Sequence, residues 1–164
     1  MKKILILTIL CIGLGTTVRA QTFSQNAIGL RLGGNEGFST EVNYQRALSS
    51  ENRLELGLSW RSGDFFNAVK ATGLYQWVWN IDGGFNWYAG AGASFGFFDV
   101  DNRFDGFTDD DNEIFINAAG DIGVEYNFDF PLQISLDFRP EISIINDIDD
   151  GLEFDLALGV RYTF

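Results

Sequence analysis

The final stretch of the chain, Leu152 to Phe164, constrains the fold more than any other. From Phe154 onward every second residue is apolar, and the residues between are small or polar. A period of two that continues to the end of the chain is typical of an extended strand with one apolar and one polar face. A tilted strand of about nine to eleven residues is long enough to cross a bilayer. The sequence therefore predicts a terminal strand that can span a membrane.

The amino-terminal residues form a separate segment. Met1-Lys2-Lys3 is a short basic start, Ile4 to Leu14 is a nearly unbroken apolar run, and Val18-Arg19-Ala20 ends in a small residue. This order of basic, apolar and small residues is that of a secretory signal peptide. We therefore interpret residues 1–20 as a cleaved signal peptide and residues 21–164 as one mature domain.

Charge and cysteine content exclude several classes of protein. Cys11 follows Leu10, whereas a lipidation motif has a small residue at that position, so we do not expect a lipid anchor. Cys11 is the one cysteine of the chain and is lost with the signal, so we expect no disulfide. The chain has 11 basic and 23 acidic residues, and loss of Lys2, Lys3 and Arg19 leaves eight basic residues and a net charge of −15. This charge argues against nucleic acid as a partner. Beyond the signal no apolar run has the length of a membrane helix, so membrane insertion would require a closed barrel.

The mature sequence alternates between apolar and polar residues in seven further stretches, separated by Gly-rich or acidic turns. Eight strands joined in order predict an all-β fold, an eight-stranded up-and-down antiparallel transmembrane β-barrel, because an open sheet would leave unpaired backbone groups at its edges. We expect the longest link at 97–112. The expected strands are 27–32, 38–45, 53–61, 68–79, 85–96, 113–126, 132–141 and 152–164.

The two faces of such a barrel can be assigned in opposite ways. A membrane barrel turns its apolar face outward, whereas a soluble secreted lipocalin-like barrel turns it inward and binds a small apolar ligand. Lys70 is the one lysine of the mature chain, and arginine, which suits crowded carboxylate pairing, supplies the other cations of the polar face. We therefore favour the membrane barrel and expect an interior charge network. Its predicted members are Arg53, Glu55, Asp137, Arg139, Glu141 and Arg161.

The aromatic residues of the apolar face support the same assignment, because they fall near strand ends, as in an interfacial girdle. The faces of 85–96 are ambiguous, since this strand is rich in Gly and Ala, and we favour Trp87 as outward-facing. With both termini in the periplasm, the long acidic links lie outside the cell. The periplasmic rim would then carry Tyr44, Trp77, Trp79, Trp87, Tyr126, Tyr162 and Phe164, with Trp60 at the opposite rim.

We expect neither catalysis nor a cofactor. The whole chain lacks histidine and the mature chain lacks cysteine, which removes the commonest base and nucleophile. Asp121, Asp137 and Glu141 could form a carboxylate dyad, but pairing with Arg139 and Arg161 favours a structural role. An eight-stranded barrel filled by side chains also predicts no diffusion pore.

The link between the fifth and sixth strands is strongly acidic. Clustered carboxylates bind hard cations such as Ca²⁺. Their spacing here differs from that of an EF-hand loop, so a solvated surface loop is the competing interpretation. The Ca²⁺ candidates are Asp99, Asp101, Asp105, Asp109, Asp110 and Asp111.

The last six residues, Gly159-Val160-Arg161-Tyr162-Thr163-Phe164, resemble the terminal strand of bacterial outer-membrane β-barrels. Ala157 departs from that pattern, in which a polar residue is usual two positions before the glycine. The resemblance implies that the barrel assembly machinery reads Gly159, Tyr162 and Phe164 as an insertion signal.

Two internal stretches, Trp87 to Gly92 and Pro131 to Pro140, are also similar to the OmpA- and OmpX-like group of small outer-membrane barrels. This resemblance covers residues 21–164. It implies a Gram-negative cell envelope, a lipid bilayer as partner, and a role in envelope integrity or in surface interaction through the loops. It identifies no extracellular ligand.

Overall fold

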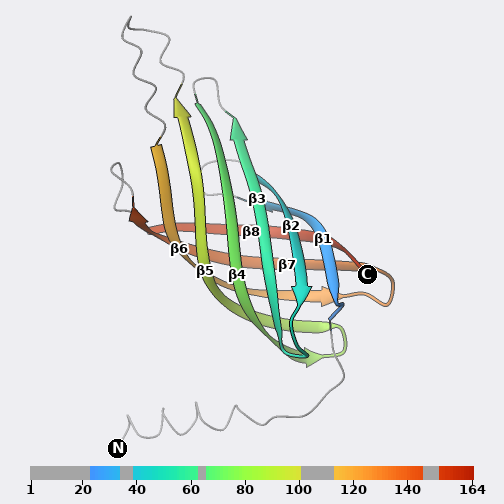
Figure 1. The fold of residues 1–164 in the computed structure, drawn as a ribbon. Coiled ribbons are helices and arrows are strands. Elements are labelled where there is room, and N and C mark those ends of the chain that lie inside the picture. The colour runs from blue at the N-terminus through green and yellow to red at the C-terminus, as the bar shows by residue number, and fades with distance from the viewer. Residues whose placement is uncertain (1–22, 34–38, 63–65, 101–112, 146–151) are drawn as a thin grey trace, which may run out of the picture.

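A computed structural model of the chain describes residues 23–33, 39–62, 66–100, 113–145 and 152–164. They form one closed barrel in which each strand pairs antiparallel with its neighbours in the chain (Figure 1). No helix among these residues is long and apolar enough to cross a membrane. The strands are β1 (Asn26–Gly33), β2 (Ser39–Ala47), β3 (Asn52–Ser62), β4 (Phe66–Asp82), β5 (Phe85–Val100), β6 (Glu113–Asn127), β7 (Leu132–Ile145) and β8 (Leu152–Thr163).

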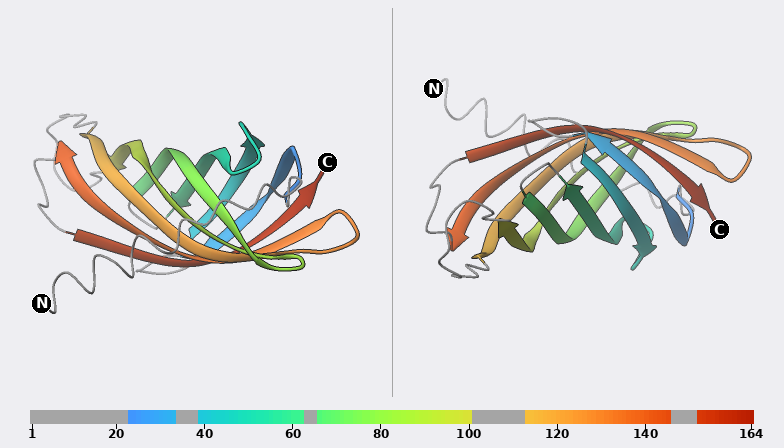
Figure 2. Two further views of the ribbon diagram at one scale, coloured as in Figure 1. Left: turned by 90° about the horizontal axis from the view of Figure 1, so that it is seen from below. Right: turned by 90° about the horizontal axis from the view of Figure 1, so that it is seen from above.

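Pairing of the first strand with the last closes the barrel. Leu30 of β1 lies opposite Val160 of β8. At the chain end, Asn26 N donates to Phe164 O at 3.0 Å and Phe164 N donates to Asn26 O at 2.9 Å. Closure leaves no edge strand with unpaired backbone groups. The strands are strongly tilted, so those of the front and back walls cross in Figure 1 and in both views of Figure 2.

The predicted fold class and strand order are confirmed, but several strands are longer than predicted. β4 spans Phe66–Asp82 and β5 reaches Val100, so the prediction that the link begins at residue 97 is wrong. Phe66 lies opposite Val100 in the register of these two strands. The physical reason is that each strand supplies backbone partners to the other, which extends the ladder past the alternating residues.

β7 also continues beyond the predicted end at residue 141. Pro140 has no N–H and would normally interrupt a strand. It faces Gly120 of β6, where an added Cβ would lie 3.2 Å from Pro140 Cγ. Backbone pairing of β6 with β7 is present on either side, at Ala119↔Glu141 and Ile122↔Phe138. A glycine opposite the proline therefore lets the strand continue.

Three short connections lie at the barrel end that carries Asn26 and Phe164, which we call the terminal rim. They join β2 to β3, β4 to β5 and β6 to β7. In the tightest of them Gly83 has a φ of 52°, a conformation that glycine adopts without a Cβ clash. The remaining four connections start from the opposite end, and they include the two that are longest in sequence, 101–112 and 146–151.

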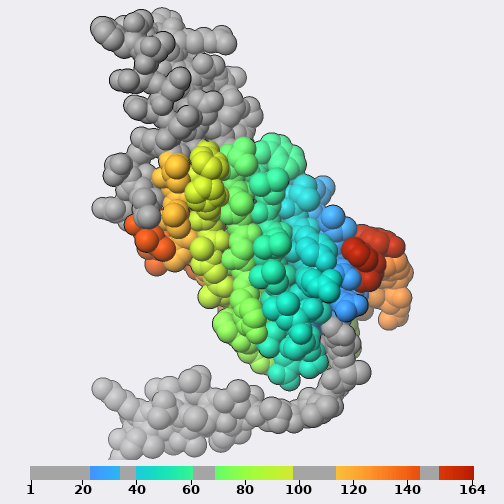
Figure 3. Space-filling model, viewed as in Figure 1, coloured from blue at the N-terminus to red at the C-terminus, as the bar shows by residue number. Residues whose placement is uncertain are grey.

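The barrel is polar inside and apolar outside. Inward Arg139 is 1% exposed, whereas outward Leu56 is 48% exposed. β5 shows the favoured faces, with Trp87 exposed and Tyr88 buried. In the space-filling view the side chains of β3, β4 and β5 form a continuous front wall (Figure 3). This polarity is the reverse of the soluble lipocalin-like alternative, whose interior would be apolar.

Candidate functional site in the barrel interior

The inward side chains of opposite walls meet in the middle of the barrel, because eight strands enclose only enough space for side chains. Two inward glycines make room for bulky neighbours. A Cβ on Gly123 would lie 2.5 Å from Tyr88 Oη, and one on Gly57 would lie 2.5 Å from Glu41 Cδ. Small residues on one strand thus accommodate large polar ones on the next.

Glu55 of β3 is the centre of the interior network. Its carboxylate accepts from Arg139 Nη2 at 2.9 Å, from Arg161 Nη2 at 3.3 Å and from Gln45 Nε2 at 2.6 Å. Arg139 also forms an ion pair with Glu41 at 3.1 Å. All five side chains are buried. These contacts connect β2, β3, β7 and β8 across the barrel.

Arg53 forms a second cluster toward the terminal rim. Its Nη1 pairs with Glu125 Oε2 at 2.6 Å, and its Nε donates to Gln76 Oε1 at 2.5 Å. The guanidinium lies 4.7 Å from the ring centre of Tyr88 and 5.7 Å from that of Phe23. Phe23, which precedes β1, is itself buried. The carboxylate of Glu125 compensates the charge of Arg53, and the two rings add cation–π attraction in this closed space.

Three further ion pairs lie on the side of the network centre that is away from the terminal rim. Arg31 contacts Asp137 at 2.5 Å and Asp155 at 2.5 Å, and Lys70 contacts Glu141 at 2.9 Å. We expected Asp137 and Glu141 to pair with Arg139 and Arg161, and this prediction is wrong. Asp137 pairs with Arg31 and Glu141 pairs with Lys70. Tilt displaces facing residues along each strand, so the side chains that meet cannot be identified from sequence spacing.

Asp121 differs from the other buried carboxylates, because no ion pair to it is found among the described side chains. Its Oδ2 accepts a hydrogen bond from Gln76 Nε2. Asp137 and Glu141 each have their own cation, Arg31 and Lys70. The arrangement therefore offers three separately bonded carboxylates, and gives no support to a catalytic dyad.

All six residues predicted for the network face the interior and are no more than 2% exposed. The alternation also places Arg31, Glu41 and Glu125 among the candidate interior charges, but it assigns the amides Gln45 and Gln76 no role in the network. The structure brings together Arg53, Glu55, Asp137, Arg139, Glu141 and Arg161 with Arg31, Glu41, Gln45, Gln76 and Glu125.

The acidic Ca²⁺ candidates lie almost entirely outside the described residues, so a cation site there stays a prediction. The backbone of Asp99 belongs to β5, opposite Asn67 of β4. Within the described ranges, no group of three or more acidic, His or Cys side chains is placed to hold a metal ion. The other candidates, Asp101, Asp105, Asp109, Asp110 and Asp111, lie outside the described residues.

The predicted insertion residues lie at the end of β8. Gly159 faces the interior, where an added Cβ would lie 2.3 Å from Ser135 Oγ. Tyr162 and Phe164 face outward with ring centres 6.1 Å apart. Their role in insertion stays a prediction.

Aromatic side chains form an outward-facing girdle near the terminal rim. Trp79 and Trp87 stack at 4.3 Å between ring centres, and Phe85 packs edge-on against Tyr126 at 4.8 Å. Trp60, on the opposite half of β3, is 50% exposed. Such amphipathic rings are favoured where hydrocarbon meets water.

Comparison with known proteins gives relatives in structure alone. No family model and no curated protein matches the chain. The N-terminal β-barrel domain of Pseudomonas aeruginosa OprF aligns with a TM-score of 0.65 at 14% identity, over 86% of this chain and 99% of that one. Neisserial surface protein A aligns with a TM-score of 0.62 at 14% identity, over 85% of this chain and 94% of that one. Ail, the attachment invasion locus protein of Yersinia pestis, aligns at 0.56 and 14% identity, over 86% and 97%.

These alignments cover nearly the whole length of each solved barrel, and their low identity limits the likeness to the fold. The closed eight-stranded architecture and its polar interior agree with that likeness. The chain has the fold of the small eight-stranded outer-membrane β-barrels, the OmpA- and OmpX-like group.

Proposed function

We propose that the chain is an integral outer-membrane protein that contributes to the cell envelope or to surface interactions, and that it is neither a pore nor an enzyme. Its termini lie in the periplasm, and the barrel assembly machinery inserts it. The observation that carries the proposal is the reversed polarity of the barrel. Leu56, Leu58 and Leu136 are each about half exposed on the outer wall, while Arg53, Arg139 and Arg161 are fully buried.

Physical chemistry favours lipid as the medium outside this wall. A continuous apolar surface of this kind in water would promote association, whereas hydrocarbon solvates it. The interior cations Arg31, Arg53, Lys70, Arg139 and Arg161 each pair with a carboxylate, so their charges are compensated inside the barrel. An aromatic girdle at the terminal rim suits the boundary between acyl chains and headgroups.

The surface role is assigned to the end opposite the terminal rim. Four connections leave from that end, and the sequence of one of them, 101–112, is rich in aspartate. Solvated acidic loops repel anionic lipid and present carboxylates to the exterior. Loop contact with an external partner is therefore the form of interaction that we propose.

A charge on the outer wall tests membrane insertion. Replacing Leu56, on the outer face of β3, with arginine should destabilise the barrel in liposomes by about 2–4 kcal/mol if the residue faces the middle of the bilayer. The measurement is urea unfolding in phospholipid vesicles, with folded barrel identified by its heat-modifiable mobility.

Leu48→Arg is the matched control, because Leu48 is exposed in the turn after β2 at the terminal rim. It should cost only about 0–1 kcal/mol, as expected near the interface. Equal stability of Leu56→Arg and the parent would show that the wall does not face lipid.

A further inference from the structure

Arg46 is the one cation among the described side chains that lies on the outer wall. It follows Tyr44 on the outward face of β2, close to the terminal rim. Its Nη1 donates to Asn26 Oδ1 at 3.2 Å, and Tyr44 Oη donates to the same oxygen at 2.7 Å. A guanidinium has five N–H donors, so this single bond leaves Arg46 able to bind an external anion.

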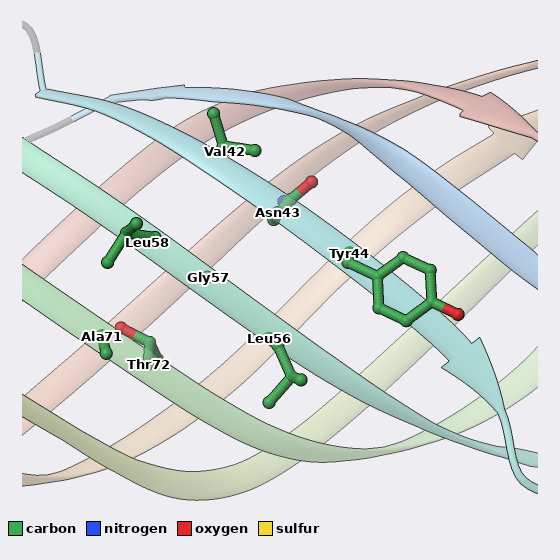
Figure 4. A pocket seen from close by; sticks show the side chains of 8 residues that line it. All are labelled: Val42, Asn43, Tyr44, Leu56, Gly57, Leu58, Ala71 and Thr72. Carbon is green, nitrogen blue, oxygen red and sulfur yellow. The ribbon is translucent and has the colours of Figure 1, made fainter.

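Arg46 follows Tyr44 by two residues on the outward face of β2. Tyr44 lines a shallow apolar groove in the outer wall. The groove has a volume of about 390 Å³ and crosses β2, β3 and β4 (Figure 4). The backbone at Gly57 lies between the aliphatic side chains of the groove. The Tyr44 ring extends along β2 toward the arrowhead, and the chain continues in that direction to Arg46. The outward side chains that line it are Val42, Tyr44, Leu56, Leu58 and Ala71.

Small residues on β4 keep the groove open. Ala71 lines it, and the nearest atom to a Cβ built on neighbouring Gly73 is Leu56 Cδ2 at 3.8 Å. On β4 and β5 the same rim is occupied by stacked aromatics such as Trp79 and Trp87, which carry no charge. Among the described side chains, Arg46 therefore gives the β2 side of this rim a positive charge that the aromatic side lacks.

We propose that the groove and Arg46 together bind one glycerophospholipid of the bilayer leaflet at the terminal rim. An acyl chain occupies the groove, and the phosphodiester accepts hydrogen bonds from the guanidinium. The planar donors of arginine match phosphate oxygens, and the aliphatic lining matches a hydrocarbon chain. The inference rests on the proposed membrane location and names the partner that this part of the outer wall selects.

Native mass spectrometry of the folded full chain in detergent tests the site, with dioleoyl phosphatidylglycerol as the probe. One lipid should remain bound to the parent. Arg46→Gln should retain about tenfold less, the fold-change for loss of one charge-assisted hydrogen bond, and Arg46→Lys should restore part of the binding. Dioleoylglycerol, which has the same chains without phosphate, should bind as weakly to the parent as to Arg46→Gln.

A matched pair of variants tests the groove. Ala71→Trp should fill it and lower lipid retention, whereas Ala91→Trp, an equally outward substitution on β5, should not. Inorganic phosphate at the same concentration should not displace the lipid. Displacement by phosphate would make the site one for a free anion, and a protein dimer abolished by Ala71→Trp would make the occupant a second copy; either result overturns the proposal.

Folding in liposomes distinguishes a failure of the lipid site from a failure of the proposed membrane location. Each variant is first checked for heat-modifiable mobility, so that only folded protein is compared. If the barrel folds in liposomes but Arg46→Gln and the parent retain equal lipid, the lipid site alone is wrong. If the parent does not insert into liposomes, the proposed membrane location fails and the lipid site with it.

Discussion

At the scale of single residues, the interior depends on groups that have several partners. Glu55 accepts hydrogen bonds from two arginines and from Gln45. A buried ion pair contributes little net stability compared with a well-packed apolar pair, but removing one partner leaves an uncompensated buried charge. The network therefore adds little to the free energy of unfolding, but each of its side chains requires the presence of its partners.

Neutralising Glu55 tests this dependence. Glu55→Gln should lower the free energy of unfolding by about 3–5 kcal/mol, because Arg139 and Arg161 lose a buried counter-charge. Urea titration in vesicles measures the change. Glu51→Gln, in the exposed turn before β3, should stay within about 0.5 kcal/mol of the parent. Similar values for the two variants would contradict a central role for Glu55.

Close packing of Tyr88 against β6 gives a second residue-level test. Gly123→Ala would place a methyl group 2.5 Å from Tyr88 Oη and should cost about 1–3 kcal/mol through overpacking. The double variant Gly123→Ala/Tyr88→Phe should recover part of that loss. Gly73→Ala, whose nearest neighbour is 3.8 Å away, should be nearly neutral in the same denaturation experiment. A neutral Gly123→Ala would mean that the ring moves aside.

At the scale of strands, pairing partners and turn residues determine where each element ends. β4 and β5 extend one another beyond their alternating centres, and Gly83 ends both in a tight turn. β8 has a different importance, since it must pair with β7 and with β1 to close the sheet. Its last residues therefore close the barrel, and their recognition during insertion is a proposal to be tested.

The assembly role that we propose for the end of β8 can be separated from its folding role. Phe164→Ala should reduce the amount of heat-modifiable barrel in the outer-membrane fraction of expressing cells, while refolding of the purified chain into detergent stays close to that of the parent. Phe130→Ala removes an exposed aromatic at the same rim and is the control. Equal losses in cells and in detergent would assign Phe164 a structural role only.

At the scale of the whole molecule, the polar interior and apolar exterior act together. Ion pairs that cross the barrel fill its centre, and Phe23, Val78 and Tyr88 form an apolar cluster in the interior. The exterior offers hydrocarbon contacts over all eight strands. We expect a barrel of this construction to anchor its loops at a membrane surface without opening a path through it.

Conductance in planar bilayers tests the closed interior. The inserted barrel should give no current steps of porin size, because side chains occupy the space that ions would need. A sixteen-stranded porin inserted under the same conditions is the positive control. Steps of porin size from this chain would contradict the filled interior and the non-conducting function.

The sequence by itself determined the number of strands, their order and, for most strands, which residues share a face, because alternation with a period of two separates an apolar side from a polar side. Leu56 and Arg53 could be assigned to opposite faces for that reason. Only the tertiary structure decided which charges meet, as Arg31 with Asp137 and Lys70 with Glu141, and that Val42, Leu56 and Ala71 of three strands line one apolar groove. Strand tilt and register bring together residues from distant strands, and the alternating pattern of a single strand predicts neither of them.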